Sequence, residues 1–323
     1  MDIALAEISL IIVNYNTINL LRDCLTSLMQ TEGRACEIIV VDNASADNSA
    51  SMVAKEFPGV ALIRNQQNSG FSKASNQGLR QAKGRYFLLL NPDTVVRAGA
   101  IGVMAEFLVS HAQVGAVTCK LLNADGTIQP STSNRPGPVL LFFRLLGISR
   151  LVPGDWVRRW LSRTCGLFLG RTIRSYLTPY DAHDSVEVQN ISGACLMLRR
   201  EAVEQVGLLD ERFFMYFEDM DYCLRLQNAG WKMFYLPQGE IVHLCGMSSG
   251  GRMRNYSAHS YRALFHFYKK HFSNAMVIFV RSMVVAASSV RWVWNWTRSK
   301  FSKKPVYRQN ELDLKQVIRV CFE

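Results

Sequence analysis

Short apolar runs alternate with helical patterns through the first 120 residues, and polar residues follow the runs. Five runs are continuous enough to be buried strands: 8–13, 37–42, 60–63, 86–91 and 114–119. Helical patterns fill the intervals near 18–30, 47–57, 72–82 and 98–110. This alternation predicts an α/β fold, a mainly parallel sheet flanked by helices. Ligands of such sheets bind at the carboxyl ends of the strands, so the residues after each run are the first candidates for function.

The later chain continues this pattern and then departs from it. Residues 191–207 predict a strand and a short helix, and a further helix ends near Gly230. A last strand is predicted over 231–237, and His243 follows the end of that strand. We therefore predict one large α/β domain over 1–251, with an Arg-rich insertion at about 135–185, and a basic helical tail over 252–323.

The net charge of +11 is concentrated in two segments. Residues 135–175 hold eight arginines and one acid, and residues 252–308 hold twelve Lys or Arg and no acid. Those segments carry +7 and +12, so the remainder of the chain is near −8. Basic stretches of this kind indicate either nucleic acid or an anionic membrane surface as partner. Nucleic acid is disfavoured, because no aromatic RNA-binding module is evident.

The tail favours a membrane surface. On a helical wheel Arg281, Arg291 and Arg298 fall on one side of residues 276–298, and apolar residues with Trp294 fall on the other. An amphipathic helix packed on the domain is the alternative interpretation. We expect the helix not to span, because its arginines interrupt the apolar run. The eight cysteines form no C-x-x-C pair and no secretory signal precedes the first strand, so we expect a cytoplasmic protein, peripheral on the inner face of the cell membrane.

Six sequence pieces resemble the family 2 inverting glycosyltransferases, whose fold is called GT-A. The pieces are "VNYN", "VVDNASAD", "NSGFSKASNQG", "LLLNPDT", "SGACLMLRR" and "FEDMDYCLR", in this order between about Ser9 and His243. Their second half is most similar to the rhamnosyltransferase-like branch. The resemblance implies transfer of a sugar, with rhamnose the leading candidate, from a dTDP- or UDP-sugar to a glycan or polyprenyl-linked acceptor in cell-surface polysaccharide synthesis.

The resemblance implies a nucleotide site at the first three strand ends. Asp42 would accept the N–H of a uracil or thymine base, flanked by Asn14, Tyr15 and Asn16. An Asx-turn is the structural alternative for Asp42, and both can hold at once. The loop at 64–78 would supply further nucleotide or sugar contacts from its residues Asn68, Gly70 and Asn76, since glycine permits close backbone approach. An ordinary tight loop is the alternative.

The fourth strand end predicts a divalent metal site. Asp93 follows Pro92, and one carboxylate suffices for Mg²⁺ or Mn²⁺ when substrate phosphates complete the coordination. Relatives often carry Asp-x-Asp here, whereas this chain has Asn91 in the first position, a weaker neutral ligand or a hydrogen-bonding neighbour. A helix N-cap is the alternative for Asp93. The resemblance also implies that His243 contacts the metal or the diphosphate; a structural histidine is the alternative.

The stretch "FMYFEDMDYCLR" places three carboxylates beside an aromatic wall that we expect to be largely buried. Acids are favoured at a helix N-terminus, which is the structural explanation. A glycosyltransferase also needs a carboxylate to deprotonate the acceptor hydroxyl, and apolar surroundings raise the pKa of such a group. The resemblance places this base at Asp219 of the pair Glu218–Asp219. Asp221 would bind the acceptor or orient its neighbours, and Arg225 would pair with Asp221 or Glu218.

Together these expectations describe a metal-dependent hexosyltransferase that inverts the anomeric centre in a single displacement. Two rivals remain at this point. A sugar nucleotidyltransferase would be expected to carry a Gly-rich basic loop after the first strand, and "VNYNTINL" has neither Gly nor Lys. A non-catalytic membrane- or nucleic-acid-binding protein would bind through the basic segments without turnover.

Overall fold

The structure is a computed structural model that describes residues 7–31, 36–133, 141, 184–244, 258–301 and 305–323. Most of the predicted insertion at 135–185 lies outside these residues. The chain divides into two compact units. The described part of the first is 7–31, 36–133, 184–214 and 218–244, and that of the second is 141, 215–217, 258–301 and 305–323.

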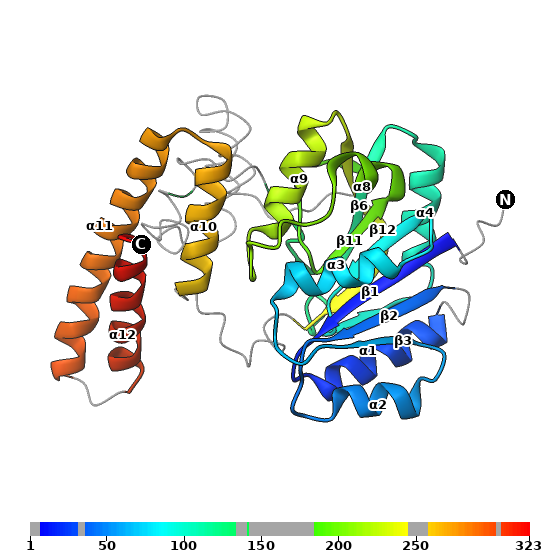
Figure 1. Ribbon diagram of the computed structural model, residues 1–323, viewed down its shortest axis with the longest axis horizontal. Helices are drawn as coiled ribbons and strands as arrows, with labels where there is room; N and C mark the ends of the chain where they lie inside the picture. Colours follow the sequence, from blue (N-terminus) through cyan, green and yellow to red (C-terminus); the bar gives the residue numbers. More distant parts are fainter. Residues whose placement is uncertain (1–6, 32–35, 134–140, 142–183, 245–257, 302–304) are drawn as a thin grey trace. The chain divides into compact units, whose positions relative to one another are not determined.

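A mixed sheet forms the centre of the first unit (Figure 1). In the described part of the chain its main path runs β3-β2-β1-β4-β11-β6-β12-β5. The strands are β1 (Ile8–Asn14), β2 (Glu37–Asp42), β3 (Ala61–Arg64), β4 (Tyr86–Leu90), β5 (Thr94–Val96), β6 (Val114–Leu122), β11 (Cys195–Arg199) and β12 (Lys232–His243). Strands β3, β2, β1 and β4 are parallel, and β11 is antiparallel to both β4 and β6. The predicted sheet is therefore confirmed, with the antiparallel strand β11 inserted at its middle.

Small strands extend this arrangement. Strand β7 (Ile128–Gln129) pairs with β6, and β9 (Val186–Glu187) pairs with β12. Strands β8 (Thr132–Ser133) and β10 (Asn190–Ile191) form a separate two-stranded sheet. The register places Asn14 of β1 opposite Asp42 of β2, so two of the predicted site residues are neighbours at the same edge of the sheet.

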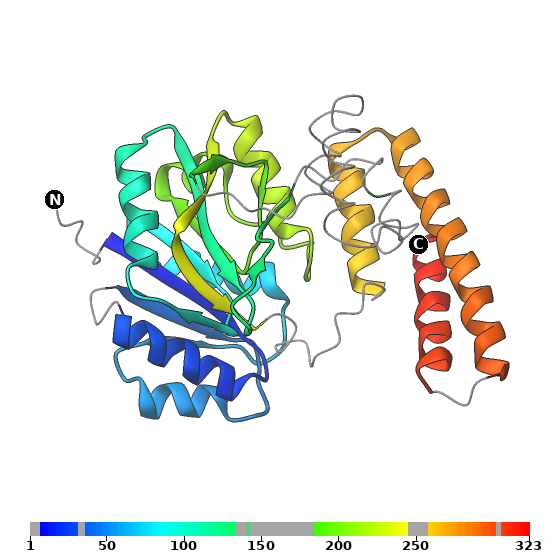
Figure 2. The same ribbon diagram turned by 180° about the vertical axis from the view of Figure 1, so that it is seen from behind.

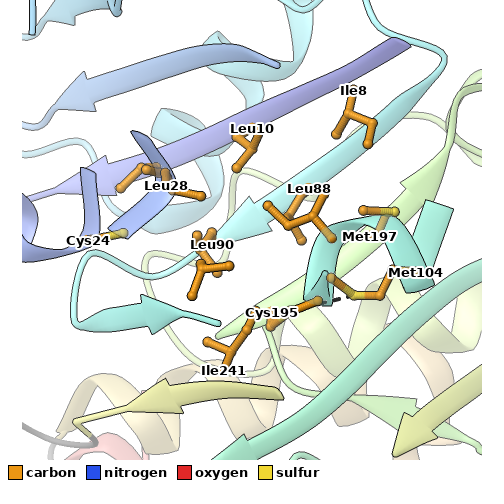
Figure 3. Packing of buried hydrophobic residues seen from close by; sticks show 14 of the residues in the cluster. Ile8, Leu10, Cys24, Leu28, Leu88, Leu90, Met104, Cys195, Met197 and Ile241 are labelled. Atoms are coloured by element: carbon orange, nitrogen blue, oxygen red, sulfur yellow. Dashed lines mark hydrogen bonds between the residues drawn. The ribbon is translucent and has the colours of Figure 1, made fainter. Parts of the chain in front are cut away.

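Helices cover both faces of the sheet, as Figures 1 and 2 show from opposite sides. Side chains of one sheet face pack with α1 (Ile18–Thr31), α2 (Ser49–Glu56) and α4 (Ala100–Ser110). The opposite face packs with α3 (Phe71–Gln81), α8 (Arg200–Val206) and α9 (Glu218–Asn228). Figure 3 shows how Leu10, Leu88 and Met197 of successive strands meet the helical residues Leu28 and Met104 on the first face. Because the strands are buried on both faces, their sequences are almost continuously apolar.

Strand β12 is longer than predicted. It runs through His243, which we expected to follow the strand, because the pairing with β6 is interrupted by a register shift between Leu236 and Glu240 and then resumes. Pro237, which has no amide proton to donate, lies within that shift. The last residues of β12 also pair antiparallel with β5, and His243 lies opposite Thr94. The sequence analysis missed strand β5.

The second unit is helical in its described part from Ala258 onward. It contains α10 (Ala258–His271), α11 (Asn274–Phe301) and α12 (Pro305–Val320). Helices α11 and α12 lie side by side (Figures 1 and 2). By length and composition, helix α11 is long and apolar enough to cross a membrane. The sequence analysis had expected its arginines to make the apolar run too short.

Candidate functional site

The ends of β1 and β2 hold one carboxylate in a fixed orientation. Asn14 Nδ2 donates to Asp42 Oδ1 at 3.0 Å and to Ser45 Oγ at 3.0 Å. The backbone N–H of Ser45 donates to Asp42 Oδ2 at 3.1 Å, which is the turn hydrogen bond anticipated as the structural alternative. Asp42 is 4% exposed, so its carboxylate is immobilised at the carboxyl edge of the sheet. Each oxygen keeps lone-pair capacity for one further donor.

The loop after β1 carries an aromatic ring next to Asn14, the residue that donates to this carboxylate. Asn16 has a positive φ of 54°, and its side-chain Oδ1 accepts the N–H of Ala46 at 2.7 Å. Its own N–H donates to Ser45 Oγ at 2.9 Å, so the two loops are tied together. Tyr15 is 46% exposed between these anchored residues. A ring held on a fixed backbone with its surface open is suited to stack on a planar ligand.

Asn43, which the sequence analysis did not select, organises the loop before α3. Its Nδ2 donates to Asn68 Oδ1 at 2.8 Å and to the carbonyl of Gly70 at 3.2 Å. Its Oδ1 accepts from Asn65 Nδ2 and from the N–H of Ser69. Asn43 is 2% exposed and directly follows a buried strand. A polar residue at that position in the sequence could have identified it as a candidate.

Two predicted contact residues are engaged with the protein itself. Asn76 is 1% exposed; its amide donates to the carbonyl of Leu209 and to Glu211, and its Oδ1 accepts the N–H of Leu209. Gly70 has a φ of 84°, and a Cβ there would lie 2.5 Å from the carbonyl oxygen of Phe214. The close approach predicted for this glycine exists, but the partner is this chain's own backbone.

A carboxylate and an imidazole converge at the ends of β4 and β12. Asp93 Oδ1 and His243 Nε2 are 3.2 Å apart, and Asn91 Nδ2 is 3.4 Å from the same nitrogen. Asp93 is 1% and His243 8% exposed. The N-cap alternative for Asp93 does not apply, because the next element is β5 and not a helix.

Gln129 sets the orientation of His243. Its Oε1 lies 2.6 Å from Nδ1 of the imidazole, and its amide nitrogen donates to Asn123. An amide oxygen only accepts, so in the neutral imidazole Nδ1 carries the proton and Nε2 presents a lone pair toward Asp93. Sequence reasoning missed Gln129, since it lies 114 positions from its partner.

This donor pair fits a divalent cation that takes its other ligands from a substrate. In the described residues no group of three His, Cys, Asp or Glu side chains is placed to hold a metal by itself. One carboxylate oxygen and one imidazole nitrogen are nevertheless an appropriate protein contribution for Mg²⁺ or Mn²⁺ bound together with phosphate oxygens and water. Asp93 and His243 are therefore the residues that would hold the ion.

Helix α9 begins with the adjacent carboxylates Glu218 and Asp219. Asp219 Oδ2 accepts the N–H of Gly193 at 3.1 Å, and Oδ1 accepts the N–H of Met220 at 2.8 Å. Burial raises the pKa of Asp219, and these backbone donors oppose that rise by stabilising the ionised form. Burial also raises the pKa of Glu218, to about 8, with a contribution from the charge of Asp219. Glu218 Oε2 is buried, and no residue in the described part of the chain forms a hydrogen bond with it.

Asp221 points into the protein. It is fully buried and pairs with Arg225 Nε at 2.9 Å, one helical turn away. The other nitrogens of Arg225 donate to the carbonyls of Val206 and Leu208. Of the two roles considered for Asp221, this arrangement fits the orientation of neighbours.

The aromatic stretch before α9 is more open than expected. Phe213 is 1% exposed, but Phe214 is 44%, Met215 39% and Tyr216 41% exposed. The expectation of a largely buried aromatic wall is therefore wrong for these three residues. Tyr216 and Phe217 have positive φ values of 73° and 67°, which non-glycine residues adopt at a cost and which concentrate at functional sites.

Hydrogen bonds connect the separate parts of the site within the first unit. The N–H of Asn91, two residues before Asp93, donates to the carbonyl of Ala194 at 3.0 Å, and the preceding residue, Gly193, donates to Asp219. On the other side, the carbonyl of Phe214 accepts the N–H of Phe71, directly after the Gly70 that Asn43 contacts. The strand-end carboxylates and the start of α9 thus belong to one bonded constellation.

Comparison with known proteins identifies the family of the chain. The model of "Glycosyl transferase family 2" matches residues 9–207, and that of "Glycosyl transferase family group 2" matches 145–298. The chain is 27% identical over 238 residues to an N-acetylglucosaminyl-diphospho-decaprenol L-rhamnosyltransferase of Mycobacterium tuberculosis, covering 70% of this chain and 72% of that protein. It is 31% identical to a poly-beta-1,6-N-acetyl-D-glucosamine synthase of Staphylococcus aureus, over 76% of this chain and 52% of that protein.

Solved structures agree in fold. The mannosyltransferase PcManGT of Pyrobaculum calidifontis, in complex with GDP-Man and Mn²⁺, matches with a TM-score of 0.53 at 16% identity, over 98% of this chain and 86% of that one. GalNAc-T7 with UDP, GalNAc and Mn²⁺ matches with a TM-score of 0.52 at 15% identity, over 73% of this chain and 42% of that one. The fold is the GT-A type. The chain belongs to glycosyl transferase family 2.

Proposed function

We propose that this glycosyltransferase moves a sugar from a nucleoside-diphosphate donor to an acceptor hydroxyl in one displacement that inverts the anomeric centre. Asp219 takes the proton of the hydroxyl as it attacks, and the nucleoside diphosphate leaves. Asp42 accepts the N–H of the nucleotide base, Asn14 and Asn16 hold that carboxylate and its loop, and Tyr15 stacks on the base. Asp93 and His243 hold a divalent ion, which when bound offsets the charge of the leaving diphosphate.

One observation carries this proposal: Asp219 is hydrogen-bonded to Gly193, whose neighbour Ala194 is bonded to Asn91 beside Asp93. The candidate base on α9 is thereby tied to the segment just before β11, and the candidate metal ligand follows β4, the strand that pairs with β11. A transferase requires this proximity, because the hydroxyl must be deprotonated close to the bond that the departing diphosphate leaves.

The different hydrogen-bond partners of Glu218 and Asp219 support Asp219 as the base. Asp219 receives two backbone N–H donors, which favour its ionised form, whereas Glu218 keeps an oxygen without a partner and a pKa of about 8. A general base must be ionised at working pH and a neighbouring neutral acid lowers the local repulsion. Glu218 then serves as a neutral hydrogen-bond donor toward the acceptor.

The donor and acceptor are inferred from the relatives. A relative from Mycobacterium tuberculosis is named as a rhamnosyltransferase acting on a diphospho-decaprenol, which supports dTDP-rhamnose as donor and a polyprenyl-linked acceptor here. A relative from Staphylococcus aureus is named as a poly-beta-1,6-N-acetyl-D-glucosamine synthase, which supports a role in glycan synthesis here. A lipid-linked acceptor requires the enzyme to work at a membrane surface, so we propose a peripheral association with the cytoplasmic face.

Ligand-dependent thermal stability and single-turnover transfer together test the proposal. We expect dTDP or UDP to raise the melting temperature only with Mn²⁺ or Mg²⁺ present, because ligands of the folded state stabilise it. Asp219→Asn should keep this shift and lose transfer by about 10²–10⁴-fold, the usual contribution of a general base. Asp93→Ala should lose the metal-dependent part of the shift.

Two outcomes would contradict the proposal. Transfer by Asp219→Asn at the wild-type rate would remove Asp219 from the mechanism. A folded wild-type protein that binds no nucleotide with either metal would favour the non-catalytic binding protein. Product stereochemistry, read by NMR, separates inversion from retention.

A further inference from the structure

Helix α11 turns an uncharged surface outward from the helical unit. Every exposed residue from Ala275 to Trp294 is uncharged. The largest side chains on this outer face are apolar: Ile278 is 65% exposed, Phe279 53%, Val290 71%, Val293 49% and Trp294 57%. In a chain where one residue in five is charged, a charge-free face of this length marks an interaction surface.

The charged residues of the same stretch of α11 lie on the protein side. Helix α11 packs against α12 and α10 and buries Val280, Val284 and Ser288, whereas Arg281 and Arg291 are half-buried. The Arg281 guanidinium lies 5.2 Å from the centre of the Phe265 ring and donates to the carbonyl of Cys321 at 3.3 Å. The polarity of the helix is therefore inverted relative to a soluble surface helix, with the apolar side facing out.

Cations stack on tryptophans at the end of this face. The guanidinium of Arg298 lies 4.5 Å from the ring centre of Trp294, and Lys300 Nζ lies 4.7 Å from that of Trp296. Tryptophan prefers the boundary between hydrocarbon and headgroups, and long cationic side chains extend from there to lipid phosphates. The pairs mark where an outer face embedded in lipid would meet the headgroups.

Charge identifies the occupant of the face. Residues 252–308 carry twelve basic and no acidic residues, so the same segment of a second copy would be repelled, whereas an anionic bilayer would be attracted. Helix α12 excludes a spanning arrangement for α11, because it packs alongside and carries Glu311, Asp313 and Lys315. Crossing the bilayer would take these charges into hydrocarbon, at a cost of several kcal/mol.

We infer that the outer face of α11 inserts into the acyl boundary of an anionic bilayer, with the helix lying in the membrane plane and α12 on the aqueous side. This deepens the proposed peripheral association by naming the surface that makes it, and it differs from the sequence-based expectation in which the arginine side faces water. Insertion would bury the outer face to the usual depth of about 5–10 Å.

The test is flotation of the whole protein with phosphatidylcholine vesicles, with and without phosphatidylglycerol, in the absence of any donor or acceptor. Ile278→Asn combined with Val290→Asn should lower partitioning at least tenfold, because both side chains are on the outer face. Leu312→Asn is the matched control: Leu312 is 49% exposed on α12 and should leave partitioning unchanged. All three positions are exposed, so unchanged melting temperatures verify folding.

The possible results separate the alternatives. Equal partitioning of the double variant and the wild type, or complete release of both by moderate salt, would overturn insertion in favour of a purely electrostatic contact. Concentration-dependent self-association that the double variant abolishes, without vesicle binding, would assign the face to a second copy. Asp219→Asn should float like the wild type, so failure of the catalytic proposal and failure of this one are distinguishable.

Discussion

Replacing Glu218 by Gln should stabilise the fold increasingly as the pH rises. Glu218 is 7% exposed, one of its oxygens has no partner, and its pKa is raised from 4.5 to about 8 by burial and by Asp219. Between these two values the unfolded chain has released the proton and the folded chain still holds it. Stability of the wild type therefore falls with rising pH across this window. Glutamine cannot ionise and escapes this loss.

The magnitude follows from the same two values. At 1.36 kcal/mol per pKa unit, the rise from 4.5 to about 8 corresponds to at most about 5 kcal/mol at and above pH 8, and to almost nothing near pH 4.5. Hydration of the opened helix end reduces the realised value, so we expect a gain on the order of 3 kcal/mol at about pH 8. Urea unfolding of both proteins at about pH 5, 6.5 and 8 measures it.

A second carboxylate gives the opposite sign as a control. Glu56 pairs with Arg22 on the surface, and hydrogen bonding by that guanidinium lowers the pKa of Glu56. Glu56→Gln should therefore cost stability at neutral pH and cost nothing once acid protonates the wild-type carboxylate. A stability difference for Glu218→Gln that is the same at every pH would refute the assignment of a protonated Glu218.

Two further predictions concern single contacts. Gln129→Leu should weaken Mn²⁺ binding, measured by calorimetry in the presence of dTDP, by about 10–100-fold, because the hydrogen bond between Gln129 and Nδ1 of His243, which orients the imidazole, is lost; unchanged affinity would show that the imidazole is not a ligand. Asp221→Asn should destabilise the fold by about 2–4 kcal/mol, since it leaves the guanidinium of Arg225 without its buried carboxylate; a large drop in kcat with intact stability would instead make Asp221 an acceptor contact.

Local patterns were sufficient for the main strands and helices of the first unit and for the strand-end positions. The apolar runs that became β1, β2 and β4 are buried on both faces, so their limits follow from composition alone, and the residues after them form the site. The start of α9 was predicted correctly, because acids are favoured at a helix N-terminus and Glu218 and Asp219 lie in the first turn of this helix.

Features that depend on distant partners were not predictable from the same patterns. The length of β12 depends on a register shift against β6, and the orientation of His243 depends on Gln129 of β7. The exposure of Phe214 and Tyr216 depends on backbone with positive φ nearby, which no apolar count reveals. The wheel of α11 separated a charged side from an apolar side, but it could not reveal that Arg281 on the charged side contacts the end of α12, a distant segment of the chain.

The fixed carboxylate of Asp42 has a consequence for how the proposed base site would discriminate among nucleotides. Asn14 and the Ser45 amide already hold both oxygens of Asp42, so the entropy cost of ordering this acceptor arises when the chain folds and not when a ligand binds. A base that offers an N–H at the right place gains the full hydrogen bond. A base that offers a second acceptor there meets a carboxylate that cannot rotate away, so rigidity itself becomes the means of rejection.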